Sequence, residues 1–308
     1  LWLAARFGMV DIARLLLERG ANPEERRYKP AGEKLGRGVK VKAESPLFIA
    51  CEKGHLNIAR LLLDHGAKVE LPDDAGCTPL YAASQNGHLD VASLLLKRGA
   101  NVHGPVARGA RGRSGWENAQ PLLIASENGQ FDIARLLLDN GADVASGGPL
   151  FYASKNGHHD VARLLLDRGA NVGQAEATGW SGVAISQGWS PMFIAIEFGH
   201  LDVLRLLLDR GADLRQTLPD GRTPLLLACY CGHLAIARLL LDRGGADVAR
   251  TGKSNDTSPL MAASECGHLD LVRLLLDRGA DVKQALTAGE NKGCCSLILA
   301  SSNGFPDR

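Results

Sequence analysis

One stretch of the sequence, TPLYAASQNGHLDVASLLLKRGA at residues 78–100, decides the fold, because varied copies of it recur along the chain. In this stretch the pair Gly87-His88 is followed, twelve residues after the first glycine, by a second glycine at Gly99. The other copies of the pair are Gly54-His55, Gly157-His158, Gly199-His200, Gly232-His233 and Gly267-His268, with Gly8-Met9, Gly129-Gln130 and Gly304-Phe305 as variants. The second glycine keeps its distance in the first eight of nine copies. Such self-similarity predicts a repeat array.

Each copy predicts two helices. Residues 201–209 lack the alternation of a strand and have the make-up of a short outer helix with a broad apolar face. An inner helix precedes it and opens at Ser190-Pro191, as others do at Thr78-Pro79 and Thr223-Pro224. The hydroxyl can accept a hydrogen bond from a backbone N–H, and proline suits the first helical position. The outer helix ends at Gly211, since glycine can adopt the left-handed conformation that closes a helix.

Residues 78–83, 87–91 and 94–100 resemble the ankyrin repeat almost position by position, and seven full copies lie between Ser45 and Val282. The resemblance implies an all-α solenoid of helix-turn-helix repeats with variable finger loops. The family's usual histidine after Thr-Pro-Leu is absent, and its replacements are Phe48, Tyr81, Leu123, Phe151, Phe193, Leu226 and Met261. We expect these apolar side chains to add burial between neighbouring repeats.

We expect residues 1–308 to form a single array of about nine units, with a partial unit at 1–22, full units within 45–282 and a partial unit at 296–308. The chain begins within an inner helix, at Leu1 to Ala5, and stops within another, at Leu297 to Ala300. We therefore expect a fragment of a longer protein. The stacked units would offer an extended concave surface.

Charge and composition narrow the choice of partner. The chain has 35 Lys and Arg against 34 Asp and Glu, so no overall field attracts nucleic acid or an acidic membrane. Its longest apolar runs, such as residues 225–229, are far shorter than the roughly 20 residues of a membrane span. The seven cysteines are scattered, which indicates reduced thiols. No secretory signal sequence is recognisable, so we expect an intracellular location, in the cytoplasm or the nucleus. We expect a monomeric array.

No arrangement of residues predicts catalysis. The histidines recur with the repeat, without a cysteine or carboxylate at metal-ligand or base-nucleophile spacing. Gly252-Lys253-Ser254 is similar to the end of a phosphate-binding loop, but that motif needs a glycine where the chain has Asp247. We expect no enzymatic activity, no cofactor and no metal site.

Arginine and aspartate recur four residues apart in the outer helices, as in Arg205 and Asp209. We expect each pair to lie along its own helix and to contribute a few tenths of a kcal/mol to stability.

The positions that vary between repeats are the candidates for partner binding. They include the pair before each Gly-His, where Phe198 and Tyr230 stand in adjacent units, and the finger before the first of these holds Trp180 and Trp189. Large aromatic residues that a repeat does not need for packing are candidate anchors for a partner. The alternative is that both tryptophans fold back to cover their own finger.

Two long fingers are basic and carry Arg26, Arg27, Arg108 and Arg111. They could grip an acidic peptide, a phosphate or nucleic acid, but a solvated loop is the commoner explanation of such a run.

Three functions remain open. The leading one is a non-catalytic scaffold or adaptor that binds a partner protein in its concave groove and against its fingers. The second is a targeting or substrate-recognition module of a larger enzyme, such as a kinase or ubiquitin ligase, or of a channel, with the active domain outside residues 1–308. The third is a binder of nucleic acid or phosphoinositide through the basic fingers.

Overall fold

The computed structural model describes residues 1–26, 44–104, 120–146, 148–174, 188–244, 247–249 and 257–283, and the last partial copy lies outside them. In these residues the chain forms α-helices and one short 3-10 helix, with no strand, which confirms the all-α class. No helix in this part of the chain is long and apolar enough to cross a membrane. The chain divides into two compact units, residues 1–149 and 150–308.

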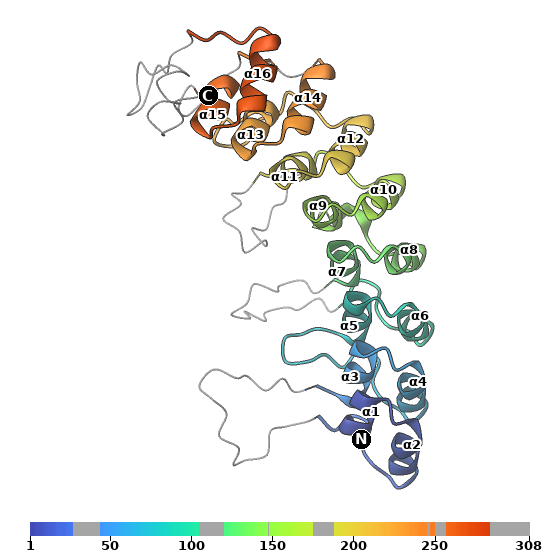
Figure 1. Ribbon diagram of the computed structural model, residues 1–308. Coiled ribbons are helices and arrows are strands. Elements are labelled where there is room, and N and C mark those ends of the chain that lie inside the picture. Colours follow the sequence, from blue (N-terminus) through green and yellow to red (C-terminus); the bar gives the residue numbers. More distant parts are fainter. Residues whose placement is uncertain are drawn as a thin grey trace. The chain divides into compact units, whose positions relative to one another are not determined.

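Unit 1 contains four helix pairs (Figure 1). The inner helices are α1 (Trp2–Phe7), α3 (Pro46–Glu52), α5 (Pro79–Asn86) and α7 (Pro121–Glu127). The outer helices are α2 (Val10–Glu18), α4 (Leu56–Asp64), α6 (Leu89–Lys97) and α8 (Phe131–Asp139), and the 3-10 helix η1 (Val144–Ser146) follows. Inner helices pack on inner helices and outer on outer, so the unit has two layers.

Unit 2 repeats this arrangement. Its inner helices are α9 (Gly148–Lys155), which begins just before the boundary, α11 (Pro191–Glu197), α13 (Pro224–Cys231) and α15 (Pro259–Glu265). Its outer helices are α10 (His159–Asp167), α12 (Leu201–Asp209), α14 (Leu234–Asp242) and α16 (Leu269–Asp277). The outer helix expected at residues 201–209 is confirmed.

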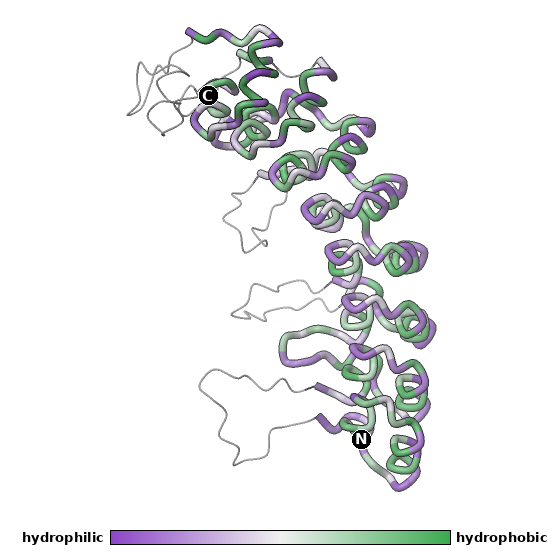
Figure 2. The backbone as a smooth tube through the Cα atoms, in the orientation of Figure 1, coloured by the Kyte–Doolittle hydropathy of each residue, from purple (hydrophilic) through white to green (hydrophobic). Residues whose placement is uncertain are grey.

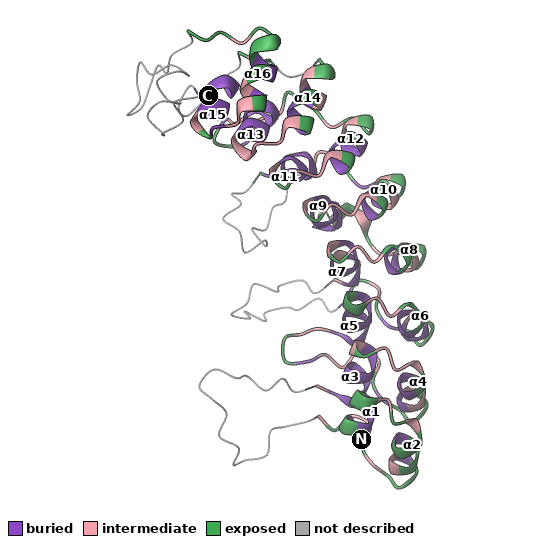
Figure 3. Cartoon of the chain, in the orientation of Figure 1, coloured by how far each residue is buried: buried purple, intermediate pink, exposed green. Residues whose placement is uncertain are grey.

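The two layers differ in burial because of where each helix lies. An inner helix has neighbours in the repeats beside it and in its own outer helix, so it is apolar on nearly every side, as in α11, where every residue before Glu197 is buried. Outer helices carry both hydrophobic and hydrophilic residues along their length (Figure 2) and keep exposed residues on one side (Figure 3). In α12 the buried stripe is Val203, Leu204, Leu206 and Leu207, as an amphipathic helix requires.

The predicted start signals cap the inner helices in four cases. The hydroxyl oxygens of Ser45, Thr78, Thr223 and Ser258 each accept a hydrogen bond from the backbone N–H three residues later. Ser190 is different, because its hydroxyl makes no cap bond at α11 and is buried without a partner.

Histidines set the register between repeats. His88 directly precedes α6, and its side chain forms a hydrogen bond with the carbonyl oxygen of Glu52 at the end of α3. His233 forms the same hydrogen bond with the carbonyl oxygen of Glu197. His55, His200 and His268 repeat the contact. In each case the ring lies against the glycine that ends the preceding inner helix, where a Cβ atom would collide with it. These histidines are structural, as the sequence predicted.

The residues that replace the family's histidine are buried, as expected. Phe48, Tyr81, Phe151, Phe193, Leu226 and Met261 are all at most 6% exposed. Leu123 is the exception and is only partly buried.

The expected pairing of arginine and aspartate within each outer helix is wrong for four aspartates. Asp209 pairs instead with Arg243 at a distance of 2.6 Å, and Arg243 directly follows the outer helix of the next repeat. The same inter-repeat pairing joins Asp64 to Arg98, Asp167 to Arg210 and Asp242 to Arg278. Stacking brings the arginine at the end of one outer helix beside the aspartate at the end of the helix before it.

Candidate partner-binding surface

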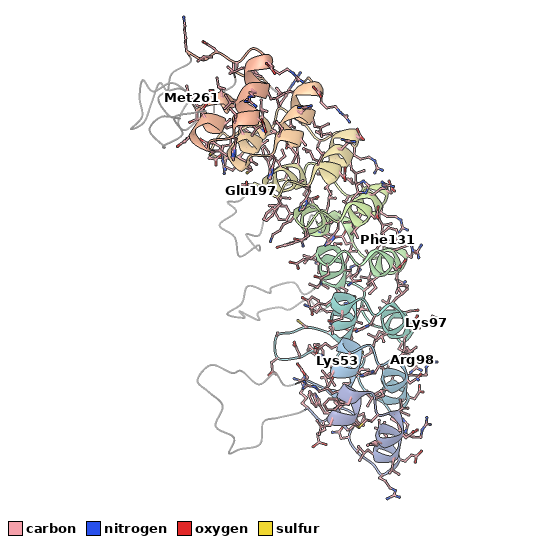
Figure 4. All side chains as sticks on the ribbon, in the orientation of Figure 1. Lys53, Lys97, Arg98, Phe131, Glu197 and Met261 are labelled. Atoms are coloured by element: carbon pink, nitrogen blue, oxygen red, sulfur yellow. The ribbon has the colours of Figure 1, made fainter. Side chains whose placement is uncertain are left out.

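The variable pairs lie at the carboxyl ends of the inner helices, where the buried part of each helix gives way to solvent. Three of the four pairs of unit 2 form what we call the helix-end patch: Glu197, Phe198, Tyr230, Cys231, Glu265 and Cys266. The fourth pair is Lys155 and Asn156, one repeat earlier. These side chains belong to α11, α13 and α15 or follow them directly, and these helices pack side by side. Figure 4 labels Glu197 on this inner-helix side of unit 2.

Phe198 is the more exposed of the two aromatic side chains of the patch. Its exposed fraction is 42%, and its ring stacks on that of His200, with centroids 6.5 Å apart and planes within 8°. The His200 ring is itself bound to the carbonyl oxygen of Lys155, at 2.8 Å. The phenyl ring is therefore held at the surface on a fixed base.

Glu197 joins two repeats through its side chain and its backbone. Its carboxylate accepts a hydrogen bond from the Cys231 thiol at 3.4 Å, and its carbonyl oxygen is bound by His233 at 3.1 Å. Burial, and then the Glu197 charge and hydrogen bond, raise the pKa of Cys231 to about 12. Because the thiolate is the nucleophilic form, the pair is not an activated nucleophile.

Tyr230 lies between the two glutamates of the patch. It is partly buried, and its hydroxyl is hydrogen-bonded to Thr257. Burial raises the pKa of Tyr230 and the Thr257 hydrogen bond lowers it, while the Glu265 carboxylate raises it and Arg222 lowers it. The aromatic ring thus has carboxylates on the inner helices to either side.

The aromatic residues predicted as anchors lie in different environments. Phe198 and Tyr230 lie on adjacent inner helices of the patch, as the sequence indicated, and Trp180 is outside the described residues. Trp189 is only 4% exposed, packs edge-on to Phe193 and lies under the Arg222 guanidinium, 5.7 Å from the ring centroid. In this position the Trp189 ring is covered and is not offered to a partner. Residues 175–187 of its finger lie outside the described residues, so the alternative that both tryptophans cover their own finger stays a prediction.

Of the four predicted basic residues, the structure describes Arg26. Its guanidinium donates to the Pro72 carbonyl oxygen at 2.8 Å and pairs with Asp74 at 3.7 Å. Arg26 therefore connects the first finger to the second. Arg27, Arg108 and Arg111 lie outside the described residues.

The corresponding positions of unit 1 are polar and bonded to one another. Lys53 pairs with Glu52 at 3.0 Å, and Asn128 donates to the Gln85 carbonyl oxygen. Figure 4 places Lys53 on the inner-helix side and Lys97 and Arg98 on the outer-helix side. The end of α1 is the exception in unit 1, with Phe7 61% exposed.

The sequence placed Glu197, Cys231, Glu265 and Cys266 among the variable pairs, but only the aromatic residues were singled out as candidate anchors. The signal was present, because all four stand at the same two positions before the glycine. The part of the chain that the structure describes holds no group of three His, Cys, Asp or Glu side chains placed to bind a metal. The patch offers aromatic faces and carboxylates, which suit recognition of another surface.

Comparison with known proteins identifies the repeat. The family model for ankyrin repeats (three copies) matches residues 1–104, 109–176, 174–252 and 193–286. The crystal structure of the human ASB11 ankyrin repeat domain superposes with a TM-score of 0.65 at 26% identity, covering 77% of this chain and 99% of that one. No curated protein matches the sequence.

Proposed function

We propose that this chain, which belongs to the ankyrin repeat family, is a non-catalytic recognition scaffold that holds a partner protein against the ends of its inner helices and its finger loops. Repeats of this family are in general protein–protein interaction modules. In this proposal the main contact with the partner lies on the helix-end patch of unit 2.

One observation carries this proposal. Phe198 is 42% exposed at a position where four other described repeats have the polar residues Lys53, Asn86, Asn128 and Asn156, and two have Cys231 and Cys266. The first repeat also has an exposed phenylalanine there, Phe7. Packing does not require a phenylalanine there, because polar residues stand at this position in four of the other repeats. Exposed aromatic residues on a rigid base are favoured in binding, since burying them excludes much apolar surface at little entropic cost.

The test places a photoreactive phenylalanine analogue at position 198 of the full chain, and separately at position 131. Phe131 is a matched control, because it is 38% exposed and lies on the outer-helix side in Figure 4. In extract from cells that produce the protein, we expect position 198 to cross-link a discrete partner that position 131 does not. In purified form that partner should bind Phe198→Ala and Tyr230→Ala about tenfold more weakly than the parent, and Phe131→Ala unchanged. Equal cross-linking at both positions, or undiminished binding by the two patch variants, would overturn the proposal.

A further inference from the structure

The helix-end patch consists of two rows of side chains across three consecutive inner helices. The second position before each glycine holds Glu197, Tyr230 and Glu265, and the position directly before it holds Phe198, Cys231 and Cys266. Because α11 packs on α13 and α13 on α15, each row crosses the stack in chain order. The first row therefore has a carboxylate at each end and an aromatic ring between them.

The repeat spacing sets the distance between the carboxylates. Packed helices lie about 8–10 Å apart, so two equivalent positions on α11 and α15 are separated by about 16–20 Å. An extended chain advances about 3.3 Å per residue, and its side chains share a face at even separations. A bound strand would therefore present one side chain to each carboxylate at positions about six residues apart.

Both carboxylates act on the groups around them. Glu197 raises the pKa of Cys231, and Glu265 raises the pKa values of Tyr230 and Cys266, each in addition to burial. Two positive charges that the structure describes lie beside this row. The Arg222 guanidinium is paired with Asp220 at 2.7 Å, and Lys155, at the same position one repeat earlier, has its Nζ atom 5.7 Å from the centroid of the Tyr152 ring. The two carboxylates thus make the part of the row from Glu197 to Glu265 acidic, which favours a cationic occupant.

We infer that the helix-end patch binds an extended protein segment with two basic side chains about six positions apart and an apolar side chain between them, the basic groups facing Glu197 and Glu265 and the apolar one facing Tyr230 and Phe198. This inference rests on the proposed function and adds the chemistry of the partner. The apolar contact supplies affinity, and the two charges select the sequence.

The test measures fluorescence anisotropy of a labelled peptide with the full chain. The probe carries two arginines about six positions apart with leucines between them, and companion peptides carry glutamine or glutamate in place of arginine, or place the arginines about three positions apart. The protein variants are Glu197→Gln and Glu265→Gln, with Glu52→Gln as the matched control at the same repeat position in unit 1.

We expect the widely spaced arginine peptide to bind the parent chain most tightly. Each patch variant should raise its Kd about threefold to fivefold, as for partly exposed ion pairs, and Glu52→Gln should leave it unchanged. The inference is overturned if the glutamine or glutamate peptide binds as tightly, or if both patch variants bind the arginine peptide like the parent. Cross-linking of a partner at position 198 in that case would leave the proposed function standing with a partner of different chemistry, whereas loss of that result as well would remove both.

Discussion

The Nε2 atom of His88 lies 3.0 Å from the carbonyl oxygen of Glu52, 36 residues earlier in the chain. A carbonyl can only accept, so Nε2 carries the proton and donates it across the boundary between two repeats. The same ring occupies the space beside Gly54, where a Cβ atom would lie 2.5 Å from Nδ1. A glycine in one repeat and a histidine in the next are therefore a single packing unit.

Gly54→Ala should destabilise the protein more than Gly66→Ala. Both glycines have positive φ, 76° and 87°, so each alanine meets the backbone penalty of about 1–2 kcal/mol. At Gly66 nothing lies within 4 Å of the added Cβ, whereas at Gly54 the His88 ring must move and its hydrogen bond is lost, at a further cost of about 1 kcal/mol. Urea denaturation followed by circular dichroism measures both free energies, and equal losses would contradict the coupling between glycine and histidine.

Thr223→Ala should lower the free energy of unfolding by about 1 kcal/mol, because the threonine hydroxyl accepts from the Leu226 N–H at 3.1 Å. Ser190→Ala, at the corresponding position of α11, should be neutral or stabilising, since the serine hydroxyl is buried without a hydrogen-bond partner. Thermal unfolding of the two variants compares them directly. A large loss for Ser190→Ala would mean that its hydroxyl caps α11 in solution.

The pair formed by Asp209 and Arg243 should contribute little to stability despite its 2.6 Å separation. The two side chains are 52% and 41% exposed, so solvent and salt screen their attraction. A double-mutant cycle with Asp209→Asn and Arg243→Gln should give a coupling energy below about 1 kcal/mol that falls further at high salt. A coupling energy of several kcal/mol, insensitive to salt, would argue against this.

Thiol reactivity should follow burial and the Glu197 charge. Burial raises the pKa values of Cys51 and Cys229 strongly, so both should resist alkylation near pH 8 until the protein unfolds, while the exposed Cys266 should react first among the described cysteines. Glu197→Gln removes a charge that raises the Cys231 pKa above the usual value, so it should increase the thiolate fraction and the alkylation rate at Cys231. Peptide mass spectrometry after timed alkylation reads each site, and an unchanged rate at Cys231 would be the contrary result.

Much of the fold could be predicted because its signals are local. Proline after a hydroxyl residue, leucine spacing in the outer helix and the closing glycine each specify a helix start, face or end within a few residues. The bounds of α12 follow from these signals alone. Ser190 shows their limit, since it carries the same start signal and makes no cap bond.

The candidate site could be predicted only in part. Phe198 and Tyr230 could be selected because both stand in the pairs before the glycines, and these pairs lie side by side in adjacent repeats. The burial of Trp189 could not be predicted, since the guanidinium that covers its ring belongs to Arg222, 33 residues later in the chain. The partners of Arg26 could not be predicted either, because Asp74 and the Pro72 carbonyl oxygen belong to the second finger.

The sequence by itself determined the repeat, the helix class and the positions that vary, because each depends on contacts within one unit and on the recurrence of that unit. Tertiary structure alone decided which groups meet across a repeat boundary. Asp209 lies beside Arg243 and not Arg205, and Glu197 bonds Cys231, because stacking places residues about one repeat apart within reach of each other. These pairings depend on the distance between packed helices in space, and that distance cannot be read from the spacing of residues along the chain.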